Sequence, residues 1–198
     1  MRLKGKTALV TGAAGGMGRG IATAFAAEGA FVICADRHES ACEETAALIR
    51  SDGGTALSLE CDVTKDADIG RAIALAERER GSLDILLNGA GIMRSQQLLE
   101  TTRESFQTTL DVNLMGLFFM LQAAAKLMVK AGRGGRLAVI LASTISPGPG
   151  EFVPVTIFDT VPPAVGLLKQ SSRVPACFAD PARRDVCSLR CDNPGGRG

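Results

Sequence analysis

The chain has 198 residues, of which 46% are hydrophobic and 22% charged, and its formal net charge is +1. This balance predicts a globular protein with a sizeable core, and it gives no reason to expect nucleic acid or an anionic membrane as a partner. The strongest apolar run, residues 114–121, is too short to span a bilayer and is followed by Gln122 and Lys126. The basic residues 1–6 precede a glycine-rich loop rather than the apolar core of a signal peptide, so we expect a cytoplasmic location.

A strand, a glycine-rich turn and a helix are expected at the start of the chain. The apolar and β-branched run over residues 7–11 predicts a buried strand, which leads directly into a turn with Gly12, Gly16 and Gly18. A helical pattern follows and ends at Gly29. Because unpaired N–H groups and the positive end of the helix dipole meet there, the turn predicts a site for the pyrophosphate of a dinucleotide.

An acidic residue, Asp36, follows the second expected strand, residues 31–35. A carboxylate at this place can accept hydrogen bonds from both hydroxyls of an adenosine ribose and would repel a 2′-phosphate, which favours NAD over NADP. The neighbouring Arg37 acts in the opposite sense. An ordinary helix–strand turn is the alternative interpretation of the glycines, but it leaves Asp36 unexplained.

Strand and helix patterns continue to alternate as far as residue 142. We expect helices and strands in turn over residues 40–51, 55–61, 65–80 (with Thr64 as N-cap), 83–87, 105–131 and 136–142. Helices between consecutive strands predict a parallel sheet covered on both faces, which is an α/β fold of three layers. Ligands of such sheets collect beyond the carboxyl ends of the strands, where this chain has Gly12, Asp36, Asp62, Asn88 and Ser143.

The expected helix over residues 105–131 has almost no polar stripe in its second half. A helix that is apolar all round is expected to be buried on all sides. Packing of one face against a second copy of the chain, in a homo-oligomer, is one explanation. Coverage by neighbours within a single chain is an equally good one.

The six cysteines and the single histidine predict neither a metal site nor a disulfide. Cys34, Cys42 and Cys61 fall at positions typical of small buried thiols. No histidine lies near the other three, Cys177, Cys187 and Cys191, to complete a zinc site. His38 follows Asp36 in an expected surface loop, where we expect no catalytic role.

These motifs, in this order over residues 3–145, resemble the classical, NAD-preferring form of the short-chain dehydrogenase/reductase family. The resemblance implies a Rossmann-like doubly wound parallel sheet and hydride transfer between NAD(H) and a small alcohol or ketone substrate, with NADP the less favoured cofactor. It also implies adenine contacts at Asp62 and Val63. The implied cofactor-binding residues are Thr11, Gly12, Gly16, Met17, Gly18, Asp36, Arg37, Asp62, Val63, Asn88, Ala90 and Gly91.

The resemblance implies two catalytic-site residues as well. They are Asn113, in the sequence Val112-Asn113-Leu114, and Ser143, which follows the fifth expected strand. Several of the matched residues also have plainer explanations. Asp62 suits a helix-capping carboxylate, Asn88 suits a residue that ties neighbouring loops together, and serines commonly end strands.

The catalytic Tyr and Lys of the family are missing. The positions that match them hold Thr156 and Thr160, and the chain contains no tyrosine. A threonine hydroxyl is too weak an acid at neutral pH to replace the Tyr phenol as general acid/base. Since such a group contributes roughly 10² to 10⁴ in rate, we expect ordinary dehydrogenase turnover to be severely impaired.

The resemblance fades beyond residue 145. The prolines of residues 161–163 interrupt a helix that the family has there, and residues 173–198 contain no Lys or Glu. We expect a nucleotide-binding domain over residues 1–172, incomplete on its C-terminal side, and an atypical tail over residues 173–198 that need not be ordered. Residues 185–190 are a candidate sixth strand. Alternative splicing, a shifted reading frame or a damaged gene copy would explain the tail.

Three functional hypotheses follow. The first is an NAD(H)-linked oxidoreductase by descent, acting if at all on an alcohol/ketone pair. The second is a non-enzymatic nucleotide-binding or dimer-forming protein, which the loss of Tyr and Lys favours. The third is a truncated product that folds poorly, which the incomplete C-terminal side of the domain and an uncovered sheet edge favour.

Overall fold

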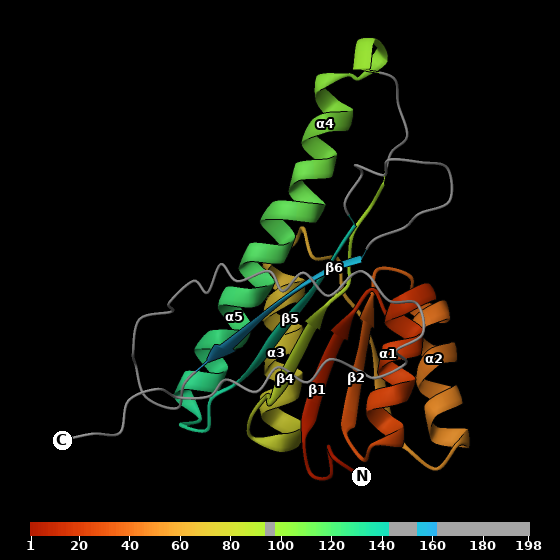
Figure 1. Ribbon diagram of the computed structural model, residues 1–198, viewed down its shortest axis with the longest axis vertical. Helices are drawn as coiled ribbons and strands as arrows, with labels where there is room; N and C mark the ends of the chain where they lie inside the picture. The colour runs from red at the N-terminus through yellow and green to blue at the C-terminus, as the bar shows by residue number, and fades with distance from the viewer. Residues whose placement is uncertain (94–97, 143–153, 162–198) are drawn as a thin grey trace, which may run out of the picture.

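The computed structural model describes residues 1–93, 98–142 and 154–161 (Figure 1). Its helices and strands, in chain order, are β1 (Thr7–Thr11), α1 (Gly16–Ala27), β2 (Phe31–Asp36), α2 (Glu39–Ser51), β3 (Thr55–Glu60), α3 (Asp66–Arg80), β4 (Ile85–Asn88), η1 (Leu98–Glu100), α4 (Arg103–Leu110), η2 (Asp111–Gly116), α5 (Leu117–Lys130), β5 (Gly135–Ala142) and β6 (Pro154–Val161). η1 is a short 3₁₀ helix and η2 is a π-helical turn.

The strands form one sheet in the order β3-β2-β1-β4-β5-β6. β1 to β5 run parallel, and Thr11 at the end of β1 lies opposite Ala35 of β2 and Asn88 of β4. Helices α1 and α2 cover one face of the sheet, and α3 and α5 cover the other (Figure 1). The predicted Rossmann-like, doubly wound α/β fold of three layers is therefore confirmed.

The core consists of two clusters, one on each face of the sheet. Leu9 of β1 and Met120 of α5 belong to the first cluster, and Val10 of β1 and Ala22 of α1 belong to the second. Since neighbouring residues of one strand enter opposite clusters, the central strands are apolar on both faces. This explains why β1 and β2 are continuous apolar runs in the sequence.

Strand β6 was not expected from the sequence. It pairs antiparallel with β5 at the sheet edge, where Thr156 lies opposite Ile140 and Thr160 lies opposite Arg136. A parallel neighbour would need a crossover of a dozen or more residues, usually a helix. Only residues 143–153 separate β5 from β6 in the chain, which favours a direct antiparallel return. The candidate strand at residues 185–190 and the tail over residues 173–198 lie outside the described residues.

The long helix runs without a break through α4, η2 and α5, from Arg103 to Lys130. Thr102 caps its start, because the Thr102 Oγ1 accepts a hydrogen bond of 3.1 Å from the Ser105 N–H. α4 extends beyond the carboxyl ends of the strands, and α5 packs on the sheet (Figure 1).

Of the two explanations for this all-apolar helix, coverage by neighbours within a single chain is wrong for the described residues, whereas packing against a second copy stays a prediction. Met120, Ala124 and Met128 are fully buried against the sheet. The opposite face leaves large apolar side chains exposed by about half, namely Leu114 (56%), Met115 (48%), Phe118 (56%) and Phe119 (38%). We call these four residues the apolar face. Periodicity could not reveal it, since an all-apolar sequence looks the same whether one face or every face is covered.

By length and composition alone, the helix Arg103–Lys130 is also able to cross a membrane. The expectation that no apolar segment of the chain has that length is therefore wrong by this measure. The core helix of a globular domain passes the same test, and α5 contributes four fully or almost fully buried residues to the core, Met120, Ala124, Leu127 and Met128.

Candidate functional site

Backbone contacts too close for a side chain join the glycine-rich turn to α1 and to the loop after β4. A Cβ atom on Gly18 would lie 2.0 Å from the carbonyl oxygen of Gly12, and one on Gly12 would lie 2.6 Å from that of Gly89. Gly12 and Gly16 also have positive φ angles, of 72° and 53°. Gly12 and Gly18 are therefore required for close approach, whereas Gly16 has open space and is favoured for its backbone conformation alone.

The start of α1 has no side-chain partner among the described residues. Its N-cap, Gly15, provides no capping side chain, and its first turn carries no acidic residue. Met17, in the same turn, is half-exposed. The other helices that begin after a loop carry acidic residues in the first turn, Glu39 in α2, Asp66 and Asp68 in α3 and Glu104 in α4. The dipole and N–H groups of α1 are thus available to an external anion.

Thr11 and Asn88 tie the ends of β1 and β4 together. The Thr11 hydroxyl donates to Asn88 Oδ1 at 2.9 Å and accepts hydrogen bonds from the N–H groups of Gly89 and Ala90 at 3.1 and 3.2 Å. Both side chains are buried. This geometry agrees with the plainer role considered for Asn88, a residue that holds neighbouring loops together.

Asp36 is held beside the glycine-rich turn. Its Oδ2 accepts a hydrogen bond of 3.2 Å from the Ala14 N–H, and its Oδ1 accepts one of 3.1 Å from the His38 N–H. The His38 ring lies against the same carboxylate, with Nδ1 3.2 Å from Oδ1. Arg37 and His38 are exposed, so the predicted surface position of His38 is confirmed. A carboxylate with about four acceptor sites retains capacity for a further donor.

Asp62 organises its own loop. Its Oδ1 accepts hydrogen bonds from the N–H and the hydroxyl of Thr64 at 3.0 and 2.7 Å. Burial raises the pKa of Asp62, but these hydrogen bonds and the nearby Lys65 ammonium outweigh burial and lower that pKa overall. The prediction that Thr64 caps α3 is wrong, because Lys65 is the N-cap and the Thr64 hydroxyl is bonded to Asp62.

Val63 packs against the long helix through a glycine. A Cβ on Gly116 would lie 2.8 Å from the Val63 Cγ2 and 2.9 Å from the Val63 carbonyl oxygen. Gly116 therefore allows the helix to approach the loop between β3 and α3 more closely than any other residue would. In the sequence, the sign of this contact is a glycine inside an otherwise apolar helical pattern.

Asn113 lies in the π-helical turn η2 and bonds the loop that follows β4. Its Oδ1 accepts from the Ile92 N–H and its Nδ2 donates to the Ile92 carbonyl oxygen, both at 2.8 Å. A Cβ on Gly91 would lie 3.4 Å from the Asn113 Oδ1, so Gly91 is also close to this amide. The second predicted catalytic-site residue, Ser143, lies outside the described residues.

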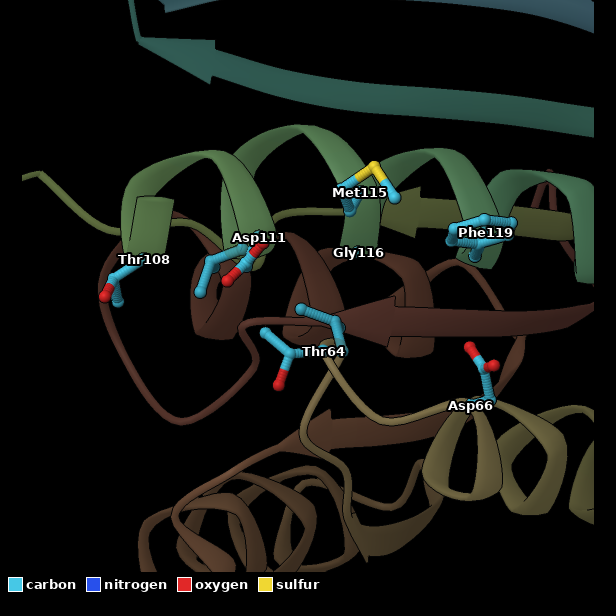
Figure 2. A pocket seen from close by; sticks show the side chains of 9 residues that line it. Thr64, Asp66, Thr108, Asp111, Met115, Gly116 and Phe119 are labelled. Atoms are coloured by element: carbon cyan, nitrogen blue, oxygen red, sulfur yellow. The ribbon is translucent and has the colours of Figure 1, made fainter. Parts of the chain in front are cut away.

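A groove of about 480 Å³ opens between the loop after β3 and the long helix. Figure 2 shows its side chains, which come from this loop, from the start of α3 at Asp66 and from the long helix. The groove is lined by Val63, Thr64, Asp66, Thr108, Asp111, Val112, Met115, Gly116 and Phe119. Of the predicted cofactor-binding residues only Val63 lines it, and neither the glycine-rich turn nor Asp36 does.

Three cysteines lie in the interior close to these loops. Cys34, Cys42 and Cys61 are free thiols and are buried, as predicted. Burial raises the pKa of Cys34 and of Cys61 to about 12 and that of Cys42 to about 11. These thiols therefore stay protonated at neutral pH and are poor nucleophiles.

Sequence comparison decides the family. The family model described as short chain dehydrogenase matches residues 6–154. The chain belongs to this family. Sorbitol dehydrogenase from Cereibacter sphaeroides is 44% identical over 137 residues, which are 69% of this chain and 52% of that protein. The chain spans about half the length of the curated relatives that it matches.

Solved structures support the same assignment. A short-chain type dehydrogenase/reductase from Mycobacterium marinum is 41% identical and superimposes with a TM-score of 0.66, covering 67% of this chain and 54% of that one. A 7α-hydroxysteroid dehydrogenase complexed with NADH and 7-oxo glycochenodeoxycholic acid is 32% identical with a TM-score of 0.68, covering 71% and 55%. The fold is thus the NAD(P)-binding Rossmann fold of a family of oxidoreductases.

The contact at Gly18 makes a testable prediction about the turn. We expect Gly18→Ala to lower the free energy of unfolding by about 1–3 kcal/mol, because the added methyl overlaps the Gly12 carbonyl. Gly20→Ala is the matched control on the same helix, where the Cβ meets no atom within 4 Å, and it should raise the stability by about 0.5–1 kcal/mol. Chemical denaturation measures both. Equal stability of the two variants would contradict the close contact.

Proposed function

We propose that this chain binds NAD(H) across the carboxyl edge of β1 to β4, with the pyrophosphate at the N-terminus of α1. The observation that carries this proposal is the side-chain-free contact of Gly12 with Gly18 and Gly89, next to a helix start without an acidic residue. A bare backbone lets the phosphates approach, and the N–H groups and helix dipole stabilise their charge. Thr11, Gly16 and Met17 complete the turn in this proposal.

The adenosine half of NAD lies, in this proposal, between the ends of β2 and β3. Asp36 accepts hydrogen bonds from the ribose hydroxyls, since its carboxylate is already fixed by the Ala14 and His38 N–H groups. The same negative charge disfavours the 2′-phosphate of NADP, although the exposed Arg37 offsets part of it. Asp62 and Val63 contact the adenine, and Asn88, Ala90 and Gly91 line the path toward the nicotinamide.

The proposed activity is hydride transfer between NAD(H) and a small alcohol or ketone, at a severely reduced rate. Asn113 and Ser143 are the proposed catalytic-site residues, but the chain has no tyrosine to serve as general acid/base. Thr156 and Thr160 do not replace it, because a threonine hydroxyl remains protonated at neutral pH. In addition, β6 carries Thr160 opposite Arg136, close to the end of β5 that is remote from the glycine-rich turn.

A second candidate function, nucleotide binding without catalysis in a homo-oligomer, is favoured by the apolar face. Leu114, Met115, Phe118 and Phe119 lie exposed along the long helix, and the rings of Phe118 and Phe119 pack edge to face 5.4 Å apart. A second copy of the chain, with its own helix set against this one, would bury the exposed rings. We propose that this homodimer forms in the cytoplasm and that its other partner is a small-molecule substrate.

Titration with NADH tests the proposed function. We expect saturable binding of one NADH per chain, measured by calorimetry or by nicotinamide fluorescence. Turnover over a panel of small alcohols should be lower by roughly 10² to 10⁴ than that of an intact relative such as sorbitol dehydrogenase. A cooperatively folded chain that binds no NADH would contradict the proposal, and turnover at the relative's rate would contradict the impairment.

Replacing the acidic residue after β2 tests the cofactor preference. Asp36→Ala should weaken NAD⁺ binding by about tenfold or more, because a hydrogen bond to a charged group is lost, and should weaken NADP⁺ binding much less. Asp52→Ala removes the same charge from the far end of α2 and should change neither affinity. Calorimetry with both cofactors, on the wild type and on each variant, gives the six affinities. An equal loss for NAD⁺ and NADP⁺ would remove the argument for NAD.

The apolar face predicts a change in assembly. Phe118→Glu should convert a dimer into a monomer at micromolar concentration, since it places a charge in the centre of the proposed interface. Leu48→Glu changes a comparably exposed apolar residue on α2, on the other side of the sheet, and should leave the dimer intact. Light scattering after size exclusion measures the mass. A wild-type chain that is monomeric at every concentration would exclude this interface.

A further inference from the structure

Arg19 lies near the start of α1, but its guanidinium group turns back toward the glycine-rich turn and across to α2. Its Nη2 donates to the Ala14 carbonyl oxygen at 2.7 Å and to the Ala41 carbonyl oxygen at 3.3 Å. Its Nε donates to the Thr45 hydroxyl at 2.9 Å, and Nη2 also pairs with the exposed Glu44 carboxylate at 3.2 Å. One side chain thus connects the turn with two successive turns of α2.

Thr45 extends this connection to the preceding residue of the turn. It is fully buried, and its hydroxyl donates to the Ala13 carbonyl oxygen at 2.7 Å. On the other side, the Ala13 N–H donates to the Ala35 carbonyl oxygen and the Ala14 N–H donates to Asp36 Oδ2, both at 3.2 Å. All four backbone polar groups of Ala13 and Ala14 therefore have fixed partners, two on α1 and α2 and two on β2.

A glycine-rich turn needs such partners if it is to bind an anion well. Gly12, Gly15 and Gly16 surround the dipeptide, and glycine loses more conformational entropy on ordering than any other residue. If the turn were loose, ordering it would cost binding free energy each time a ligand bound. A free Ala14 carbonyl could also rotate toward the phosphates and repel them, whereas Arg19 holds it away.

We propose that Arg19 is a positioning residue for the pyrophosphate of the cofactor, acting together with Thr45 by fixing the Ala13 and Ala14 carbonyl groups. This inference rests on the proposed binding of NAD(H). Arg19 acts through the backbone of the turn, and its planar guanidinium suits the task because it donates to the Ala14 carbonyl and to Thr45 at the same time.

The test compares two nucleotide fragments. ADP uses the turn, whereas adenosine uses only Asp36 and the adenine contacts. Arg19→Met keeps the apolar stem and removes every donor, so it should weaken ADP binding by about tenfold and leave adenosine binding within about twofold. Arg19→Lys retains a point charge without the fork and should lie between. Calorimetry gives the ADP affinity, and NMR shift titration gives the weaker adenosine affinity.

Two further variants complete the design. Thr45→Val removes the hydroxyl at nearly constant shape and should weaken ADP selectively, as Arg19→Met does, which keeps the test valid if Arg19→Met does not fold. Glu44→Gln is the control, because this partner of Arg19 is exposed and does not touch the turn, and it should change ADP affinity by less than about twofold.

The outcomes separate the inference from the proposed function. A wild-type chain that binds neither ADP nor NADH overturns the proposed function, and this inference with it. A wild-type chain that binds both, with folded Arg19→Met and Thr45→Val variants that bind ADP equally well, overturns the inference alone. An equal loss of ADP and adenosine affinity in these variants would also overturn it, because it would show general damage to the domain.

Discussion

The backbone of Gly12 lies in direct contact with the backbones of Gly18 and Gly89, and the rest of the site depends on this contact. A Cβ atom on Gly18 would lie 2.0 Å from the Gly12 carbonyl oxygen, so α1 can start where it does only because Gly18 lacks a side chain. The position of α1 then determines where its N–H groups and dipole act, next to Asp36 at the end of β2. In this family member, main-chain geometry builds the region where an anion can bind.

Side chains around this region hold loops in place. Thr11 and Asn88 join the ends of β1 and β4, Asn113 holds the backbone of Ile92, and Arg19 holds that of Ala14. The polar groups of these side chains have hydrogen-bond partners in the neighbouring loops, which is necessary because an unpaired buried polar group costs free energy. Fixed loops lose little entropy when a ligand binds, so this arrangement suits a preorganised nucleotide site.

The sequence predicts much of this fold for physical reasons. Strands buried on both faces are continuous apolar runs, as at residues 7–11 and 31–35, and glycines end the helices between them. The antiparallel β6 was missed because its direction depends on the length of the connection and not on its own pattern. The exposed apolar face of the long helix and the π-helical turn at Asn113 depend on tertiary contacts, which periodicity does not contain. The partners of Arg19 were equally invisible, since α2 is brought to it by the fold.

Backbone amide hydrogen exchange, with and without NAD⁺, tests the central claim most directly. If the glycine-rich turn binds the pyrophosphate, exchange should slow at residues 12–18 and around Asp36, while the helix side of the groove, at Thr108 and Met115, should not change. No protection at residues 12–18 under saturating NAD⁺, or protection confined to the helix side of the groove, would contradict the account.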